Sequence, residues 1–224
     1  MTSDLAAIAP HPALRAAINL GNRALARRDG DALHGVSPAL ARRLADEIGK
    51  PVEFVIYDGA GKTFADATAG VWDVAFLAID AKRAEAVSFT RPYKEIVATC
   101  AVRDGSPLTA VDDIDAPGTR ILVGRGSAYD LHLTATLRHA ELIRADDPGA
   151  SFEQFRAGEA DVVGGVLQSL QRAFPDGGGI RILPGRITTV RQAMVLPGHD
   201  PARIAALDDF VGRALAEGFV DTHS

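Results

Sequence analysis

Cysteine is almost absent from this sequence, since Cys100 is the single one among 224 residues. One thiol cannot form a disulfide within the chain, so the fold must be stable without that crosslink. The cysteine count therefore does not indicate whether the protein works in an oxidising or a reducing compartment. Alanine, threonine and valine surround Cys100, and no histidine is close to it in the sequence. We expect a buried, small apolar side chain here, because a nucleophilic cysteine needs a paired histidine.

Long apolar runs are also missing. No segment approaches the roughly 20 apolar residues of a membrane-spanning helix, so we expect no membrane insertion. The first four residues lack the basic start and the apolar core of an export signal. Two locations therefore stay open: the cytoplasm, or the periplasm if an export signal has been removed from this chain.

Positive charge is not in excess. The formal net charge is −5 at pH 7, and lysine occurs only at positions 50, 62, 82 and 94. Nucleic-acid-binding proteins usually carry a basic surface, so we expect no nucleic-acid partner. The six histidines show no metal-ligand spacing, and we expect neither a metal nor another cofactor.

The sequence does contain short apolar segments that alternate with amphipathic segments, which is typical of α/β folds. Two long extended stretches, 96–102 and 187–196, separate the expected strands into two groups. We therefore predict two Rossmann-like lobes joined by a two-stranded hinge. The first lobe would comprise residues 1–97 and 193–224, and the second would comprise residues 98–192. The expected strands cover residues 14–20, 52–57, 72–79, 120–123, 141–144 and 161–166.

Two serine motifs predict helix starts in the second lobe. Ser127 is followed three residues later by Asp130, and Ser151 is followed three residues later by Gln154. In this spacing the serine oxygen can accept a hydrogen bond from a free backbone amide, while the second side chain can bond back to the start of the helix. We expect one helix to begin at each serine.

Arg83 is the strongest candidate for a binding residue. A buried strand is expected to end near Ile79, and Asp80 can cap the turn that follows. Arg83 would then lie one turn into a helix beyond the carboxyl end of a strand, where ligands bind in open α/β sheets. A guanidinium there can hold a carboxylate with two parallel hydrogen bonds. The alternative is a surface ion pair of Arg83 with Asp80 or Glu85.

Residues 59–63, with the sequence GAGKT, follow an expected strand and precede a helix, as a phosphate-binding loop does. The leading glycine of that motif would fall at position 56, which is isoleucine. Without this glycine the loop cannot make the wide turn around a phosphate. We therefore expect a turn and a capped helix here, and no nucleotide hydrolysis.

Four segments in order along the chain resemble the type 2 periplasmic solute-binding proteins, and most closely the bacterial extracellular solute-binding family 3. The segments are GVSPALARRLADEIG, DVAFLAIDAKRAEAVSFTRPY, GTRILVGRGSAYD and FRAGEADVVGG, and the resemblance covers nearly the whole chain. Each segment is weak evidence alone, but their order makes the combination specific. The resemblance implies the type 2 periplasmic binding-protein fold.

The resemblance also implies roles for single residues. Arg83 would bind the ligand carboxylate, and Ser127 with the amide of Ala128 would bind from the second lobe through a helix start. Further residues would line the cleft from the first lobe: Asn19, Asn22, Tyr57, Gly61, Leu77, Ala78 and Ile79.

Two positions depart from the amino-acid receptors of this family. Those receptors usually have an acidic residue shortly after the aspartate that corresponds to Asp161, but this chain has Val166 there. Their first-lobe threonine is replaced by Ala78 or Ile79. A buried ammonium without a counter-charge is costly. The ligand is therefore expected to be a carboxylate without an α-amine, unless Gln168 holds the amine through neutral hydrogen bonds.

The function that the resemblance implies is a solute-binding receptor that closes on a small anionic or zwitterionic ligand, either an organic acid or an amino acid. An ABC-type permease would be its partner and the periplasm its location, and no catalytic residue is assigned. One alternative is an enzyme similar to cyclohexadienyl dehydratases, with Asp58 and Glu95 as the nearest candidate proton donors. Another is a cytoplasmic ligand-sensing module.

Overall fold

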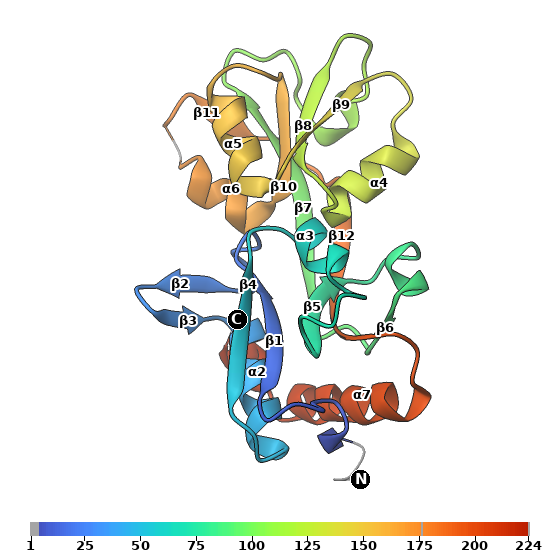
Figure 1. The fold of residues 1–224 in the computed structure, drawn as a ribbon. Coiled ribbons are helices and arrows are strands. Elements are labelled where there is room, and N and C mark those ends of the chain that lie inside the picture. The colour runs from blue at the N-terminus through green and yellow to red at the C-terminus, as the bar shows by residue number, and fades with distance from the viewer. Residues whose placement is uncertain (1–4, 176, 224) are drawn as a thin grey trace.

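The protein has two lobes, which lie one above the other in Figure 1. The computed structural model describes residues 5–175 and 177–223. The first lobe begins with the N-terminal strand and also contains the last long helix, so the chain leaves it once and returns. None of the described helices is long and apolar enough to cross a membrane.

The first lobe is built on parallel strands, as expected where apolar strands alternate with covering helices. Its first strand lies between two neighbours, with Leu14 opposite Val52 on one side and Ala16 opposite Val74 on the other. The described elements are β1 (Leu14–Asn19), β2 (Arg27–Asp29), β3 (Ala32–His34), α2 (Val36–Glu47), β4 (Val52–Tyr57), α3 (Ala60–Ala65), β5 (Val74–Ala78), the 3-10 turn η1 (Arg83–Glu85), β6 (Val87–Phe89), α7 (Pro201–Ala216) and α8 (Phe219–Thr222).

The second lobe repeats this arrangement. Its central parallel strand pairs Ile121 with Val162 on one side and with Leu142 on the other. The described elements are η2 (Val111–Asp113), β8 (Arg120–Gly124), α4 (Ala128–Thr136), β9 (Glu141–Ala145), α5 (Pro148–Arg156), β10 (Val162–Val166), α6 (Leu167–Ala173) and β11 (Ile180–Ile182).

Two ten-residue strands, β7 (Lys94–Arg103) and β12 (Thr188–Pro197), connect the lobes. They pair antiparallel with each other, from Thr188 opposite Ala98 to Gln192 opposite Lys94. Beyond this shared part, β7 continues beside β10, and β12 continues beside β5. The sheet order of the described strands is β4-β1-β5-β12-β7-β10-β8-β9. The predicted lobe boundaries, after residues 97 and 192, fall inside these two strands and stay a prediction.

Apolar side chains fill each lobe and also continue between them. A large buried cluster includes Leu14 of the first lobe and Ile121 of the second. A smaller one in the first lobe surrounds Trp72, whose indole Nε1 donates to the Thr63 carbonyl oxygen at 3.2 Å. Cys100 is buried as expected, and burial raises the pKa of its thiol, so this thiol stays protonated.

The two serine motifs have different outcomes. Ser127 caps α4 as expected, since its Oγ accepts from the Asp130 amide at 3.1 Å. The helix start predicted at Ser151 is wrong. Helix α5 begins at Pro148, because Asp147 caps it by accepting from the Ala150 amide at 3.0 Å. Proline suits the first helical position, where its missing N–H leaves no bond unmade.

Truncation of Phe155 tests the core of the second lobe. Phe155 is fully buried, and its ring packs edge-to-face on Phe174 with a centroid distance of 5.7 Å. We expect Phe155→Ala to lower the free energy of unfolding by about 3–5 kcal/mol, because it leaves a cavity that the lobe cannot fill. Urea unfolding monitored by circular dichroism measures this. The control Val71→Ala, at a side chain that is 38% exposed, should change it by less than about 0.5 kcal/mol. A similar loss for both variants would contradict this description of the core.

Candidate functional site

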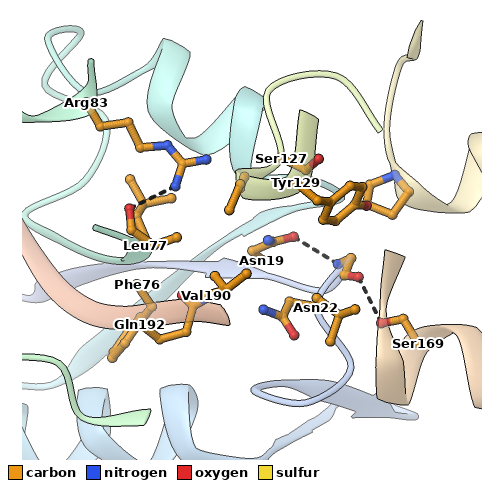
Figure 2. Close-up of a pocket in the computed structure, with 16 residues that line it drawn as sticks. Asn19, Asn22, Phe76, Leu77, Arg83, Ser127, Tyr129, Ser169, Val190 and Gln192 are labelled. Atoms are coloured by element: carbon orange, nitrogen blue, oxygen red, sulfur yellow. Dashed lines mark hydrogen bonds between the residues drawn. The ribbon is translucent and has the colours of Figure 1, made fainter. Parts of the chain in front are cut away.

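A buried cavity of about 40 Å³ lies where the two lobes meet. That volume leaves space for ordered water only, so the lobes are in close contact in this structure. Figure 2 shows side chains from both lobes around this space. The lining residues are Asn19, Gly21, Asn22, Ala60, Phe76, Leu77, Ala78, Arg83, Ser127, Ala128, Tyr129, Pro148, Val166, Ser169, Val190 and Gln192.

Arg83 contributes the only charged side chain among the described residues that line the cavity. It belongs to η1, which follows β5, and the Asp80 carboxylate fixes this turn by accepting from the Arg83 amide at 3.2 Å. Only 1% of Arg83 is exposed. Burial lowers the pKa of Arg83 to about 10, partly opposed by the charge of Asp80, so the guanidinium remains a cation at neutral pH.

The Arg83 guanidinium is held by carbonyl oxygens from both lobes. Its Nη1 donates to the Ala78 oxygen at 3.0 Å, and its Nη2 donates to the Gly126 oxygen at 2.7 Å. No carboxylate of the described residues forms an ion pair with it. Of the five N–H groups of a guanidinium, most remain available to an anion. A buried cation that lacks a direct ion pair is costly, and an anionic ligand in the cavity would reduce that cost.

The start of α4 faces the same region. Asp130 holds the preceding loop, because its Oδ2 accepts from the Gly126 amide at 2.8 Å and its Oδ1 pairs with Arg144 Nε at 2.8 Å. The amides of Ala128 and Tyr129 make no hydrogen bond within the described residues, as is normal for a first helical turn. Free amides at a helix start bind anions, so Arg83 and α4 can act on one carboxylate from opposite lobes.

Two asparagine side chains have a fixed orientation at the end of β1. Asn19 Oδ1 accepts from the Gly21 amide at 2.9 Å, and Asn22 Oδ1 accepts from the Ala24 amide at 3.2 Å. An N–H can only donate to the oxygen of an asparagine amide, so these bonds leave the two NH₂ groups as donors. Neither NH₂ group has a partner among the described residues.

Tyr129 and Gln192 are polar groups of the cavity whose side chains lack hydrogen-bond partners within the described part of the chain. The Tyr129 hydroxyl is fully buried, and burial raises its pKa, so it is a neutral donor. Gln192 is 4% exposed and lies on β12, where this strand pairs with Lys94 of β7 and Ala78 of β5.

Several direct contacts join the lobes around the cavity. Ser169 Oγ accepts from the Arg23 amide at 3.2 Å and lies 3.4 Å from the Gly21 oxygen. Lys62 Nζ forms an ion pair with Asp147 Oδ2 at 3.0 Å. Lys62 belongs to α3 of the first lobe and Asp147 caps α5 of the second, so this pair bridges the rim of the contact.

The structure brings eight of the twelve predicted binding residues to the cavity and places four elsewhere. Tyr57 donates instead to Asp66 Oδ2 at 2.7 Å, and Ile79 uses its amide to pair with the Arg191 oxygen. Gly61 lies in the lobe contact outside the cavity wall, and Gln168 is exposed. The eight that line the cavity are Asn19, Asn22, Leu77, Ala78, Arg83, Ser127, Ala128 and Val166.

Some lining residues were not predicted from the sequence. Ser169 follows Gln168 in the first turn of α6, and one residue along a helix is enough to change the side that faces the cavity. Tyr129 follows Ser127 and Ala128 in a helix start that was recognised, so it could have been found. Gln192 lies inside the expected extended stretch 187–196, but nothing local distinguishes it from its neighbours.

The two candidate proton donors lie outside the cavity. The Asp58 side chain is 70% exposed and is 3.8 Å from Lys62 Nζ, and Glu95 is exposed. No group of three or more histidine, cysteine, aspartate or glutamate side chains within residues 5–175 and 177–223 is arranged to hold a metal ion.

Comparisons with known proteins give one family and many similar structures. The sequence profile of the bacterial extracellular solute-binding proteins, family 3, matches residues 14–222. No curated protein sequence matches the chain. Three similar structures come from different kinds of protein but share this fold, with sequence identities of only 18–21%.

The first similar structure is a cysteine-binding protein from Campylobacter jejuni, with a TM-score of 0.83 and 18% identity over 98% of this chain and 90% of that chain. The second is an ancestral amino acid-binding protein, a precursor of cyclohexadienyl dehydratase, with a TM-score of 0.81 and 19% identity over 97% and 96%. The third is the periplasmic domain of BvgS from B. pertussis, with a TM-score of 0.81 and 21% identity over 100% and 44%. These likenesses confirm the predicted fold class.

Proposed function

The chain belongs to the bacterial extracellular solute-binding proteins, family 3, and on this premise we propose that it is a receptor for a small carboxylate-bearing solute. Arg83 is the observation that carries the proposal. A fully buried guanidinium that forms no ion pair with any described residue lies on a cavity between two lobes, beside the free amides of α4. A carboxylate is the ligand group that both elements favour.

Closure of the lobes on the ligand is the second part of the proposal. A cavity of about 40 Å³ cannot admit a solute unless the lobes first separate. The lobes are joined by β7 and β12, which can act as a hinge between two rigid bodies. The contacts of Arg83 with Gly126 and of Lys62 with Asp147 would then break on opening and form again on closing.

We propose transport as the biological role, with an ABC-type permease that recognises the closed form at the outer side of a bacterial inner membrane. Similar structures include substrate-binding proteins of amino acid ABC transporters. The description of the family as extracellular supports a periplasmic location.

Binding without turnover is favoured over catalysis by the residues of the cavity. The likeness to the precursor of a dehydratase makes an enzyme the natural alternative. Elimination of water needs a proton donor whose pKa lies near the working pH. The described lining has only Arg83 and Tyr129 as titratable groups, and Tyr129 has a raised pKa. Neither is suited to donate a proton to a substrate at neutral pH.

Removal of the Arg83 guanidinium tests the receptor function. We expect Arg83→Ala to weaken the binding of a carboxylate ligand by about 2–4 kcal/mol, because the ligand anion loses its buried partner. The ligand is found by a thermal-shift screen of carboxylic acids and amino acids, and its affinity is then measured by calorimetry. Lys82→Ala removes a neighbouring exposed charge and should leave the affinity nearly unchanged. Equal affinities for wild type and a folded Arg83→Ala variant would remove Arg83 from the site.

Gly61 allows a test of closure that does not disturb the ligand contacts. A Cβ at Gly61 would lie 2.5 Å from the Arg125 oxygen and 3.1 Å from Gly126 Cα, both in the other lobe. Alanine suits the helical position of Gly61 in α3, so Gly61→Ala should leave each lobe folded and should disfavour only the contact between the lobes. We expect this variant to bind the ligand more weakly and to keep a larger radius of gyration than wild type at saturation.

Gly59→Ala is the matched control for the closure test. A Cβ at Gly59 would face the same contact between the lobes, at an ordinary distance of 3.5 Å from Asp147 Cβ. X-ray scattering with and without ligand should show the same compaction for wild type and Gly59→Ala. If Gly61→Ala also compacts fully, or if wild type does not compact at all, closure through this contact is wrong.

A further inference from the structure

We propose that the solute is a carboxylic acid with neutral oxygen groups, such as a hydroxy or keto acid, and that it has no α-ammonium group. This inference rests on the proposed receptor function and concerns the same cavity. The argument uses the charges around the cavity and the direction of each hydrogen bond in its wall.

No negative charge is available to an ammonium group in the cavity. The described lining residues include no aspartate or glutamate, and their only charge is the positive one of Arg83. Acidic groups close to the lining have partners among the described residues: Asp80 accepts from the Lys82 and Arg83 amides, Asp130 pairs with Arg144, and Asp147 pairs with Lys62. An ammonium would therefore be buried without a counter-charge and close to a guanidinium, which is costly.

Most side-chain oxygens of the wall already accept one hydrogen bond from the backbone. Asn19 accepts from Gly21, Asn22 accepts from Ala24, and Ser127 accepts from Asp130. Ser169 accepts from the Arg23 amide. An ammonium has three donors and no acceptor. In this wall it would find only the second lone pair of these oxygens and the Gln192 amide oxygen, none of which carries a charge.

Donors, by contrast, remain free on several sides of the cavity. They include the NH₂ groups of Asn19 and Asn22 and the first amides of α4. A ligand with several acceptor oxygens would satisfy them. Gln192 has an amide oxygen without a partner among the described residues, and it can accept from one ligand hydroxyl. This balance fits a carboxylate that carries a hydroxyl or keto oxygen.

Matched pairs of ligands test the inference. Each L-amino acid is compared by calorimetry at pH 7 with the hydroxy acid and the keto acid that have the same side chain. Suitable sets start from glycine with glycolate, from alanine with lactate and pyruvate, and from leucine, glutamate and phenylalanine with their analogues. In the set with the preferred side chain we expect the oxygen analogue to bind at least about tenfold more tightly, because the amino acid leaves its ammonium unpaired.

A pH series adds a second readout for any amino acid that binds. Its affinity should rise about tenfold per pH unit from pH 7 towards pH 9, because only the uncharged amine form fits the cavity. The hydroxy acid should bind equally at these pH values, since neither its carboxylate nor Arg83, with a pKa of about 10, changes charge there to a large extent.

The outcomes separate this inference from the proposed function. If an amino acid binds as tightly as its oxygen analogues, with an affinity independent of pH, the inference that the solute has no α-ammonium group is wrong. The proposed receptor function would then still hold. Failure of every carboxylate in all sets to bind would overturn the receptor function and this inference with it. Tighter binding of the oxygen analogues supports both.

Discussion

The contact of one buried guanidinium with both lobes is the constraint on which the rest of the site depends. Arg83 is placed by the end of β5 and by the cap that Asp80 provides, and it donates to Ala78 in its own lobe. Its second bond goes to the Gly126 oxygen across the lobe contact. The contact with Gly126 forms only when the lobes are together, so under the proposed function one side chain would take part in both ligand binding and closure.

Close approach of the two backbones makes this arrangement possible. Gly61 and Gly126 face each other across the contact between the lobes. A Cβ on either residue would come within 2.7 Å of a backbone atom in the other lobe. Gly126 also has a φ of +67°, which glycine adopts without strain. Asp130 then fixes the loop by accepting from the Gly126 amide. The carbonyl that Arg83 needs is thus oriented by the capping of α4.

Local signals in the sequence predicted the parts of the site that local interactions determine. The position of Arg83 beyond the end of a strand was predicted from the cap at Asp80, and the helix start at Ser127 from its spacing to Asp130, whereas their binding roles came from the family resemblance and stay a prediction. The prediction that a helix starts at Ser151 failed because a stronger start signal lies just before it: Asp147 followed by proline. Residues brought in by long-range pairing, such as Gln192, gave no local signal. The orientation of Gln168 and Ser169 depends on where α6 begins, which the sequence leaves uncertain by a residue or two.

The polarity of the cavity illustrates why residue types alone are a weak guide to a ligand. Asparagine and serine can each donate or accept, so a wall that contains them is compatible with many ligands. In this protein the backbone fixes the orientation of these side chains, because turns after β1 and at the start of α4 occupy one lone pair of each oxygen and leave the NH₂ groups of the asparagines as donors. What remains directed towards a ligand is a set of donors around one cation. The proposed preference for an oxygen-rich anion therefore rests on the folding of short turns, and a change in those turns would alter the proposed preference without any change in the lining residues.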